Sequence, residues 1–472
     1  MTNKGSTAGN LIVVVAATLL LAVSAPAQPY LEKAIHTFTG GSDGALGSTQ
    51  LAADSAGNLY GTTFNGGNKS TKCAVYTGFP GCGVAFKLAP TNDGSWKETV
   101  LHTFTGGADG AVPVGGVILD SAGNLYGTTL FGGDRKPELC HAIDIYAAGC
   151  GVVYKLTPTP HGPWTETVIY SFTGGTDGSE PWGHLIFDAS GNLYGTATIG
   201  GNDSCLPPYG CGVVFKLTPG TGGPWTESVL YTFDGGTDGT YPYAGLTFDT
   251  QGNLYGTTYY GGDTSVSCEG VPGCGVVFQL APTPSGPWTE AVLHAFSGAP
   301  DGAIPLAGVT LDSAGNVYGA TYYGGDTTRY FCHRVTNGVP PGCGLVFELT
   351  QGTWEETVLH AFTDGKDGAL GYTPVIFDSS GNLYSVADVG GDRVPSCAYQ
   401  QGCGVAFKMT PAEQGPWTES VLYSFTGGTD GSVPYSNLVF DSTGNLYGMT
   451  EYGGDNSACG GYGCGVVFEL AP

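Results

Sequence analysis

One short phrase, Gly-Asn-Leu-Tyr, constrains the fold of this 472-residue chain more than any other feature. It occurs seven times, once as Gly-Asn-Val-Tyr, at intervals of 61 to 68 residues, and the copies begin at Gly57, Gly123, Gly191, Gly252, Gly315, Gly381 and Gly444. The motifs between the copies keep the same order. A period of this length indicates a repeat architecture built from one supersecondary unit, although the length alone would suggest about three domains.

Each repeat contains the pattern of four β-strands. In the fourth repeat, apolar residues alternate over 243–249, a Gly-Asn turn follows, and 254–258 forms a second strand. Residues 275–280 and 288–296 give a third and a fourth. No stretch has helical periodicity. Four antiparallel strands repeated seven times predict an all-β fold, a seven-bladed β-propeller. An open β-solenoid is the alternative.

The two ends of the chain favour a closed ring. The seventh repeat stops after its third strand, 466–470, and residues 31–38 match the fourth strand of the other repeats. An N-terminal strand that completes the last blade would leave no exposed sheet edge. We therefore predict a single propeller domain over residues 28–472.

Residues 1–27 are typical of an export signal. Lys4 precedes an apolar run of 13 residues from Leu11 to Val23, and Ala25-Pro26-Ala27 forms a small-x-small cleavage site. A membrane anchor, the competing interpretation, needs about 20 apolar residues. We therefore expect a secreted or periplasmic protein, monomeric and without a membrane span after cleavage.

Every repeat carries two cysteines in the same loop, between its second and third strands, and none is left over. In an exported chain this arrangement predicts seven short-range disulfides. Zinc competes, but two thiols without a recurrent histidine make an incomplete tetrahedral set. The predicted pairs are Cys73–Cys82, Cys140–Cys150, Cys205–Cys211, Cys268–Cys274, Cys332–Cys343, Cys397–Cys403 and Cys459–Cys464.

The repeated phrase DSAGNLYGTT, followed by GG, GVVFKLTP and WTETVLHxFTGGxDG, resembles the Gloeo/Verruco (GloVer) tandem repeat of bacterial extracellular proteins. The resemblance covers the chain from Leu31 to Pro472. Members of that family often end in a surface-sorting segment, which this sequence lacks. The family has no assigned catalytic residues to transfer, so the resemblance implies a fold and a location but no activity.

The charge balance restricts the partners. The chain has 15 basic and 40 acidic residues. Nucleic acids and anionic membranes bind to basic patches, so neither is expected as a partner. A cation or a neutral ligand fits the balance better, and we expect a glycan or an extracellular protein.

The strand directions place the Cys loops and the Gly-Gly-x-Asp-Gly connections on one face of the ring, here called the top face. The aspartates of the connections are Asp43, Asp109, Asp177, Asp238, Asp301, Asp367 and Asp430. A second set, which includes Asp134, Asp263 and Asp326, precedes the Cys loops. Clustered carboxylates can bind calcium, the one cofactor considered. Sevenfold recurrence favours instead an Asp that caps its own turn.

Four aromatic residues share one repeat position at the entrance of the first strand: Trp182, Tyr243, Tyr372 and Tyr435. Near a channel mouth they would offer flat surfaces on which sugar rings or aromatic ligands stack. The alternative is that they plug the channel by packing on one another.

A polysaccharide hydrolase or lyase would need an acid–base pair at the channel mouth. Glu180, His184 and Asp177 are the only non-repeating grouping of suitable residues there. The other histidines either share a repeat position with tyrosine or lie in variable loops. The sequence therefore favours a binding or scaffold module over an enzyme, and a purely structural surface or matrix protein is the third possibility.

Overall fold

The computed structural model describes residues 1, 30–47, 49–68, 70, 73, 79–133, 140, 149–160, 163–284, 287–328, 332, 341–397, 401–412 and 415–472. The expectations for the export signal, for Asp134 and for the histidines at 141, 161 and 333 fall outside these residues.

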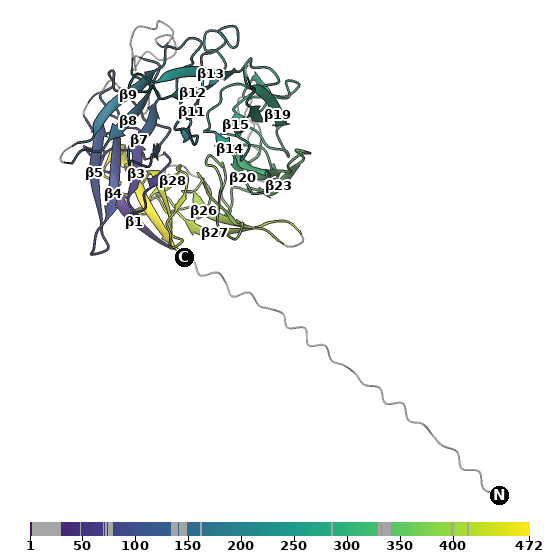
Figure 1. Ribbon diagram of the computed structural model, residues 1–472. Coiled ribbons are helices and arrows are strands. Elements are labelled where there is room, and N and C mark those ends of the chain that lie inside the picture. Colours follow the sequence, from purple (N-terminus) through teal and green to yellow (C-terminus); the bar gives the residue numbers. More distant parts are fainter. Residues whose placement is uncertain are drawn as a thin grey trace.

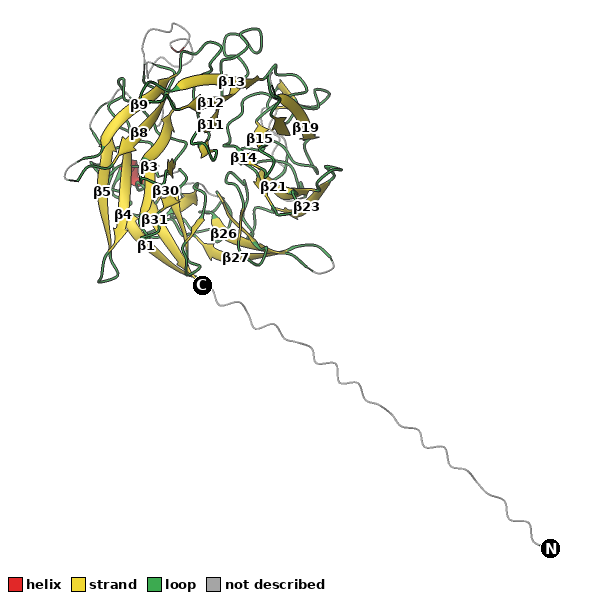
Figure 2. Ribbon diagram, in the orientation of Figure 1, coloured by secondary structure: helices red, strands yellow, loops and turns green. Residues whose placement is uncertain are grey.

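Seven antiparallel sheets form a ring around a central channel, so the chain is a seven-bladed β-propeller, as predicted (Figures 1 and 2). Within a blade the strands follow chain order from the channel outwards, as β11, β12 and β13 show in Figure 1. Apart from the single residue Cys140, the described residues contain no α-helix, and one 3-10 turn is formed by Cys459–Gly461. None of their helices is long and apolar enough to cross a membrane.

Blade 1 consists of β2 (Ala52–Ala53), β3 (Leu59–Thr63), β4 (Val84–Pro90) and β5 (Trp96–Thr103). Blade 2 consists of β6 (Val117–Leu119), β7 (Leu125–Thr129), β8 (Val152–Thr157) and β9 (Thr165–Ser171). Blade 3 consists of β10 (Ile186–Phe187), β11 (Leu193–Ala197), β12 (Val213–Thr218) and β13 (Thr226–Thr232). Blade 4 consists of β14 (Thr247–Phe248), β15 (Leu254–Thr258), β18 (Val276–Ala281) and β19 (Thr289–Ala295). Blade 5 consists of β20 (Thr310–Leu311), β21 (Val317–Thr321), β22 (Leu345–Leu349) and β23 (Glu356–Ala361). Blade 6 consists of β24 (Ile376–Phe377), β25 (Leu383–Ala387), β26 (Val405–Thr410) and β27 (Thr418–Ser424). The Cys loop of blade 4 adds the hairpin β16 (Ser267–Cys268) and β17 (Val271–Pro272).

Blade 7 joins the two ends of the chain, as predicted. It contains β28 (Ser432–Pro434), β29 (Val439–Phe440), β30 (Leu446–Tyr452), β31 (Val466–Ala471) and β1 (Leu31–Thr37). Strand β1 pairs antiparallel with β31 along its whole length, from Leu31 opposite Ala471 to Thr37 opposite Val466. The ring is therefore closed by hydrogen bonds between its ends.

The first strand of each blade is shorter than predicted. The expected strand over 243–249 is reduced to β14, Thr247–Phe248. Before β14, the Ala244 carbonyl bonds to the preceding blade, where Thr196 Oγ1 donates to it at 2.9 Å. Pro242 has no N–H to contribute to a ladder. The backbone at the channel wall therefore joins neighbouring blades.

The Gly-Asn-Leu-Tyr phrase closes a turn on the face opposite the Cys loops, here called the bottom face. In blade 1 the Asp54 carboxylate accepts hydrogen bonds from the Ala56 and Asn58 amides, from the Asn58 side chain and from the Tyr60 hydroxyl, at 2.7 to 3.0 Å. The same network recurs at Asp120, Asp188, Asp249, Asp312, Asp378 and Asp441. The phrase therefore recurs because every blade needs this turn.

Aromatic contacts repeat at the interfaces between blades. The Tyr60 ring of blade 1 packs 6.1 Å from Trp164 of blade 2, centroid to centroid, and Phe38 of blade 7 packs 5.4 Å from Phe86 of blade 1. At the interface between blades 6 and 7, Tyr30 stands in the tryptophan position and hydrogen-bonds to Tyr384. Closure thus extends to the side chains.

Candidate functional site

The Cys loops and the connections between blades share the top face. The start of the blade 1 Cys loop forms a bridge to the preceding connection, between Ala45 and Asn65. All seven predicted disulfides form, and the described residues contain no free cysteine. Each loop is also anchored to the next blade, because the carbonyl of its second cysteine accepts a backbone hydrogen bond there, as Cys82 does from Val112 at 3.0 Å.

The anchoring residue has a left-handed backbone in every blade. Its φ is between 54° and 63° at Leu46, Val112, Glu180, Tyr241, Ile304, Leu370 and Val433. Side chains other than glycine seldom adopt this conformation, and β-branched ones are strained by it. The predicted catalytic candidate Glu180 therefore occupies a repeated structural position, and its carboxylate lies near the buried hydroxyl of Tyr243 and helps to raise the pKa of that hydroxyl.

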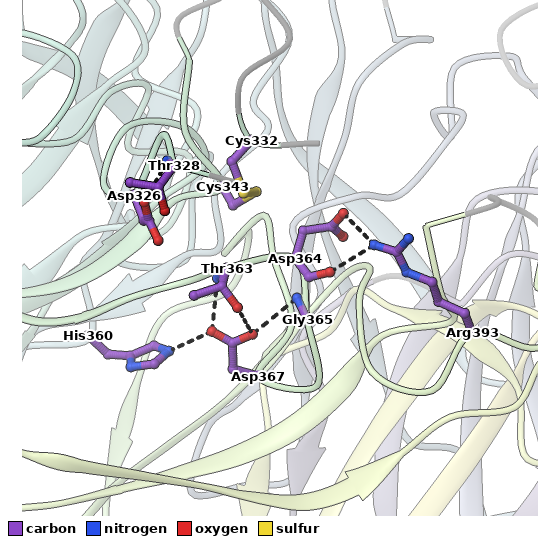
Figure 3. Close-up of a disulfide and its surroundings, with 10 residues drawn as sticks. All are labelled: Asp326, Thr328, Cys332, Cys343, His360, Thr363, Asp364, Gly365, Asp367 and Arg393. Carbon is purple, nitrogen blue, oxygen red and sulfur yellow. Dashed lines mark hydrogen bonds and ion pairs between the residues drawn. A yellow bond between two sulfur atoms is a disulfide. The ribbon is translucent and has the colours of Figure 1, made fainter. Parts of the chain in front are cut away.

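The aspartate of each connection caps its own turn. Asp367 accepts hydrogen bonds from the Thr363 amide and hydroxyl at 2.8 and 2.7 Å and from the Gly365 amide at 3.2 Å, and it lies 3.2 Å from His360 Nε2 (Figure 3). Asp177, another catalytic candidate, is bound in the same way by Thr173 and by the Tyr170 hydroxyl. A structural role accounts for both carboxylates.

The predicted calcium candidates among the described residues lie apart from one another. Asp263 accepts hydrogen bonds from the Ser265 amide and hydroxyl. Asp326 accepts one from the Thr328 amide, as Figure 3 shows. Each caps the start of its own Cys loop, in blade 4 and blade 5 respectively. The structure does not gather them into one ligand set.

The four entrance aromatics meet at the top of the channel. Tyr372 and Tyr435 stack with ring centroids 3.8 Å apart, and Trp182 packs edge-on against Tyr243 at 5.3 Å. The Tyr372 hydroxyl hydrogen-bonds to both Tyr435 and Trp182, which joins blades 3, 6 and 7 across the channel. The rings therefore pack on one another, and each stays partly exposed. Ligand contact remains a prediction for those exposed parts.

The cavity in the channel is small. Its volume is about 70 Å³, and residues of all seven blades line it, among them Gln50, His184 and Asn437. Ligand pockets usually have about 300–1,000 Å³, so this one has room for a few waters. The His184 ring packs against Gly245, and burial lowers its pKa to about 4. The histidine is therefore neutral at pH 7 and lies inside the channel.

Two acidic residues that the sequence analysis did not single out lie beside the stacked tyrosines. The position five residues after the Leu or Val of the Gly-Asn-Leu-Tyr phrase is occupied by Phe64, Leu130, Thr198, Tyr259 and Tyr322 in blades 1 to 5. Blades 6 and 7 carry Asp388 and Glu451 there. A comparison of the repeats at this one position would have found the pair.

One oxygen of the Asp388 carboxylate is enclosed without a donor among the described residues. Its side chain belongs to a residue that is 3% exposed, and its Oδ1 has no hydrogen-bond partner among the described residues. Burial and the charge of Glu451 raise its pKa well above the usual range. Burial also raises the pKa of Glu451 to about 7, against the effect of a hydrogen bond from Tyr452. Both carboxylates act on the Tyr372 and Tyr435 hydroxyls.

A further carboxylate lies on the other side of the channel. Glu269 Oε2 accepts hydrogen bonds from the Tyr259 and Tyr260 hydroxyls at 3.2 and 2.5 Å, and the Tyr259 ring lies 5.3 Å from Tyr243. We call the whole set the acidic–aromatic rim; its members are Glu180, Trp182, Tyr243, Glu269, Tyr372, Asp388, Tyr435 and Glu451. None of the ion pairs found among the described residues involves Glu269, Asp388 or Glu451.

Larger grooves lie between the bottom turns of adjacent blades. Their volumes are about 420, 540 and 490 Å³. The first lies between Asp249 and Asp312, which face it together with Tyr255. These carboxylates already accept the hydrogen bonds of their own turns. The grooves therefore offer a ligand few free acceptors.

The interfaces between blades contain a second set of acids that the sequence analysis missed. The glutamate two residues after the recurring tryptophan position has one buried carboxylate oxygen without a hydrogen-bond partner among the described residues. This holds for Glu32, Glu98, Glu166, Glu227, Glu290, Glu356 and Glu419. Each faces the connection of the preceding blade. At Glu356 the facing groups are Asp301 and His294, and one ligand atom of each of the three lies within 4.8 Å of the others.

A family model now accounts for the repeats. The model of the Gloeobacter/Verrucomicrobia repeat matches residues 72–332 and 330–472. The chain belongs to this family. No curated protein matches its sequence.

Several solved structures are similar to the chain at low identity. The calcium structure of a Trichoderma reesei carbohydrate-active enzyme of family AA12 is 12% identical, with 94% of this chain and 96% of the other covered and a TM-score of 0.41. TolB from Acinetobacter baumannii is 12% identical, with coverages of 78% and 66% and a TM-score of 0.38. A gluconolactonase from Xanthomonas campestris is 13% identical, with coverages of 76% and 91% and a TM-score of 0.36. At these identities and scores the likeness says nothing about activity.

Proposed function

We propose that this member of the Gloeobacter/Verrucomicrobia repeat family is an extracytoplasmic glycan-binding module whose ligand lies on the acidic–aromatic rim. The observation that carries the proposal is the combination, at one channel mouth, of partly exposed aromatic rings with the carboxylates of Glu269, Asp388 and Glu451, which form no ion pair with a described lysine, arginine or histidine. The seven disulfides and the expected export signal support a location outside the cytoplasm.

The chemistry of the rim fits a sugar. The apolar face of a sugar ring stacks on flat aromatic surfaces such as those of Trp182 and Tyr243. Its hydroxyls are hydrogen-bond donors, and carboxylate oxygens such as those of Asp388 and Glu451 are acceptors. The cavity below is too small for a sugar residue, so the ligand lies across the rim and does not enter the channel.

A glycan array probed with the disulfide-bonded protein tests this proposal. We expect one class of neutral or basic glycan to bind, and Trp182→Ala to weaken that binding by at least about tenfold, since loss of a stacking aromatic costs about 1.4 kcal/mol or more. Tyr209→Ala is the matched control, because Tyr209 is an exposed aromatic outside the rim. An array without any bound glycan, or equal binding by Trp182→Ala and the wild type, would contradict the proposal.

A hydrolase is the second candidate, and the acidic pair Asp388 and Glu451 favours it. Carboxyl groups with raised pKa values serve as general acids in glycosidases. Incubation of the bound glycans with the protein, followed by a reducing-end assay, separates the two functions. A hydrolase would release reducing ends, and Asp388→Asn and Glu451→Gln would stop the release while glycan binding persists. A binding module would release none.

A further inference from the structure

The strongest unexplained feature of the molecule is the pair of carboxylates of Asp388 and Glu451. They come from adjacent blades, β25 ending just before Asp388 and β30 containing Glu451. Five other blades place an apolar, aromatic or hydroxyl side chain at this position. The repeat therefore does not require an acid here, and the charge of Glu451 disfavours ionisation of Asp388.

Nothing in the described part of the chain neutralises the pair. Neither carboxylate forms an ion pair with a described lysine, arginine or histidine. Asp388 is 3% exposed, and its Oδ1 has no hydrogen-bond donor among the described residues. Its backbone N–H donates to the Leu370 carbonyl at 3.4 Å. An enclosed carboxylate without a donor or a counter-charge is costly. A bound cation would remove that cost.

We propose that Asp388 and Glu451 bind a divalent cation of the calcium class at the rim of the channel. The two carboxylates supply up to four oxygens, which are the ligands that calcium prefers, and waters or ligand hydroxyls complete its shell of six to eight. The Tyr372 and Tyr435 hydroxyls lie beside the carboxylates and offer further oxygen atoms. The site lies in the proposed glycan-binding rim, but it rests on the carboxylates alone and not on glycan binding.

The donor set excludes a soft-metal alternative. The cysteines described at this face are paired in disulfides, and His184, the histidine of the channel cavity, lies in blade 3. Zinc and copper prefer nitrogen and sulfur ligands, whereas oxygen-only sites suit calcium, magnesium and manganese. Magnesium needs a near-ideal octahedron, which two carboxylates on separate blades provide less readily than the flexible calcium shell.

Terbium, which replaces calcium and emits when a nearby aromatic ring is excited, is the probe. The full protein is stripped of metal with EDTA and titrated with terbium chloride at pH 8, where the Glu451 carboxyl is ionised. We expect emission sensitised by Trp182 and the two tyrosines, displaced by calcium in preference to magnesium. Calcium alone should also raise the Tm of the stripped protein.

The variants decide the assignment. Asp388→Asn and Glu451→Gln should each weaken terbium binding by at least about tenfold, because each removes one charged ligand. Asp263→Asn, at an exposed acid of a Cys loop, should bind terbium like the wild type. Because the two first variants remove a repulsion, we expect them to fold, and their Tm in EDTA checks this.

Three results would overturn the cation site: no sensitised emission from the wild type, emission equally strong in Asp388→Asn and Glu451→Gln, or no calcium-dependent rise in Tm at pH 8. The glycan proposal is tested separately by repeating the array in EDTA. Glycan binding that persists in EDTA, together with absent terbium emission, would remove the cation site and leave the glycan site standing.

Discussion

A single carboxylate organises each bottom turn. The Asp120 side chain accepts four hydrogen bonds, from the Ala122 and Asn124 amides, the Asn124 side chain and the Tyr126 hydroxyl. Although partial burial acts in the opposite direction, these bonds hold the pKa of Asp120 below its usual value. The charged form is therefore the one on which the turn depends.

Asp120→Ala should lower the free energy of unfolding by about 2 kcal/mol, since the hydrogen bonds to a charged group are lost and the half-buried Tyr126 hydroxyl is left without its acceptor. Urea unfolding at pH 7 measures the change. Ser121→Ala, at an exposed neighbour in the same turn, is the control and should change it by less than about 0.5 kcal/mol. Equal stability of the two variants would contradict the structural role of Asp120.

The roles of residues that recur in every repeat could be assigned from the sequence. The roles of some residues that break the repeat pattern could not. Sevenfold recurrence correctly indicated that Asp120 and its equivalents, and the connection aspartates, cap turns. Asp388 and Glu451 escaped because their significance depends on which strands end beside the channel and on what encloses them. The contact of Trp182 with Tyr372 crosses the ring, so no local pattern predicts it.

At the level of elements, strands with strong patterns were predicted well and the inner strands were not. The second strand of blade 4 has the predicted bounds, Leu254–Thr258, because both of its neighbours pair with it. The expected strand over 243–249 fails because its first residues bond across the blade interface. A sequence pattern of period two shows which residues alternate, but not whether the backbone partner is in the same sheet.

Strand β1 is the element on which ring closure depends. Removal of residues 30–38 would take away the outer strand of blade 7, the pairing of β1 with β31 and the contact of Phe38 with Phe86. The truncated chain should have a lower Tm and should self-associate through the exposed β31 edge. Size-exclusion chromatography with light scattering and a thermal scan measure both effects.

A peptide with the sequence of residues 30–38 provides the control for that truncation. It should bind to the exposed β31 edge by strand addition, restore a monomer and raise the Tm. The same residues in scrambled order should do neither. If the truncated chain stays monomeric with an unchanged Tm, closure by β1 contributes nothing to stability.

At the scale of the whole molecule, the ring has seven interfaces of similar design. Each brings a half-buried glutamate of one blade against the connection of the blade before it. Burial, followed by the charge of Asp238 at Glu290 and of Asp177 at Glu227, raises the pKa of both glutamates to about 7. At Glu356, burial and then Asp301 raise the pKa to about 9. Seven such groups make the stability of the ring depend on pH.

The direction of that dependence follows from linkage. The folded protein holds these protons to about pH 7 or above, while the unfolded chain releases them near 4.5, so the folded state binds more protons between these values. Stability from the glutamates is therefore complete below about pH 4.5 and is lost as the pH rises through 7. We expect the Tm of the disulfide-bonded protein to be higher at pH 5 than at pH 8.

Two adjacent glutamates test the source of this effect. Glu356→Gln replaces the carboxyl by a neutral amide, which can donate to Asp301 at any pH. The variant should therefore have a higher Tm than the wild type at pH 8. Its Tm should also decrease less between pH 5 and pH 8. Glu355→Gln alters an exposed neighbour and should leave both quantities unchanged. The groups that face Glu356 are Asp301 and His294. A wild-type Tm that rises from pH 5 to pH 8, or an unchanged slope in Glu356→Gln, would show that the interface does not hold a proton.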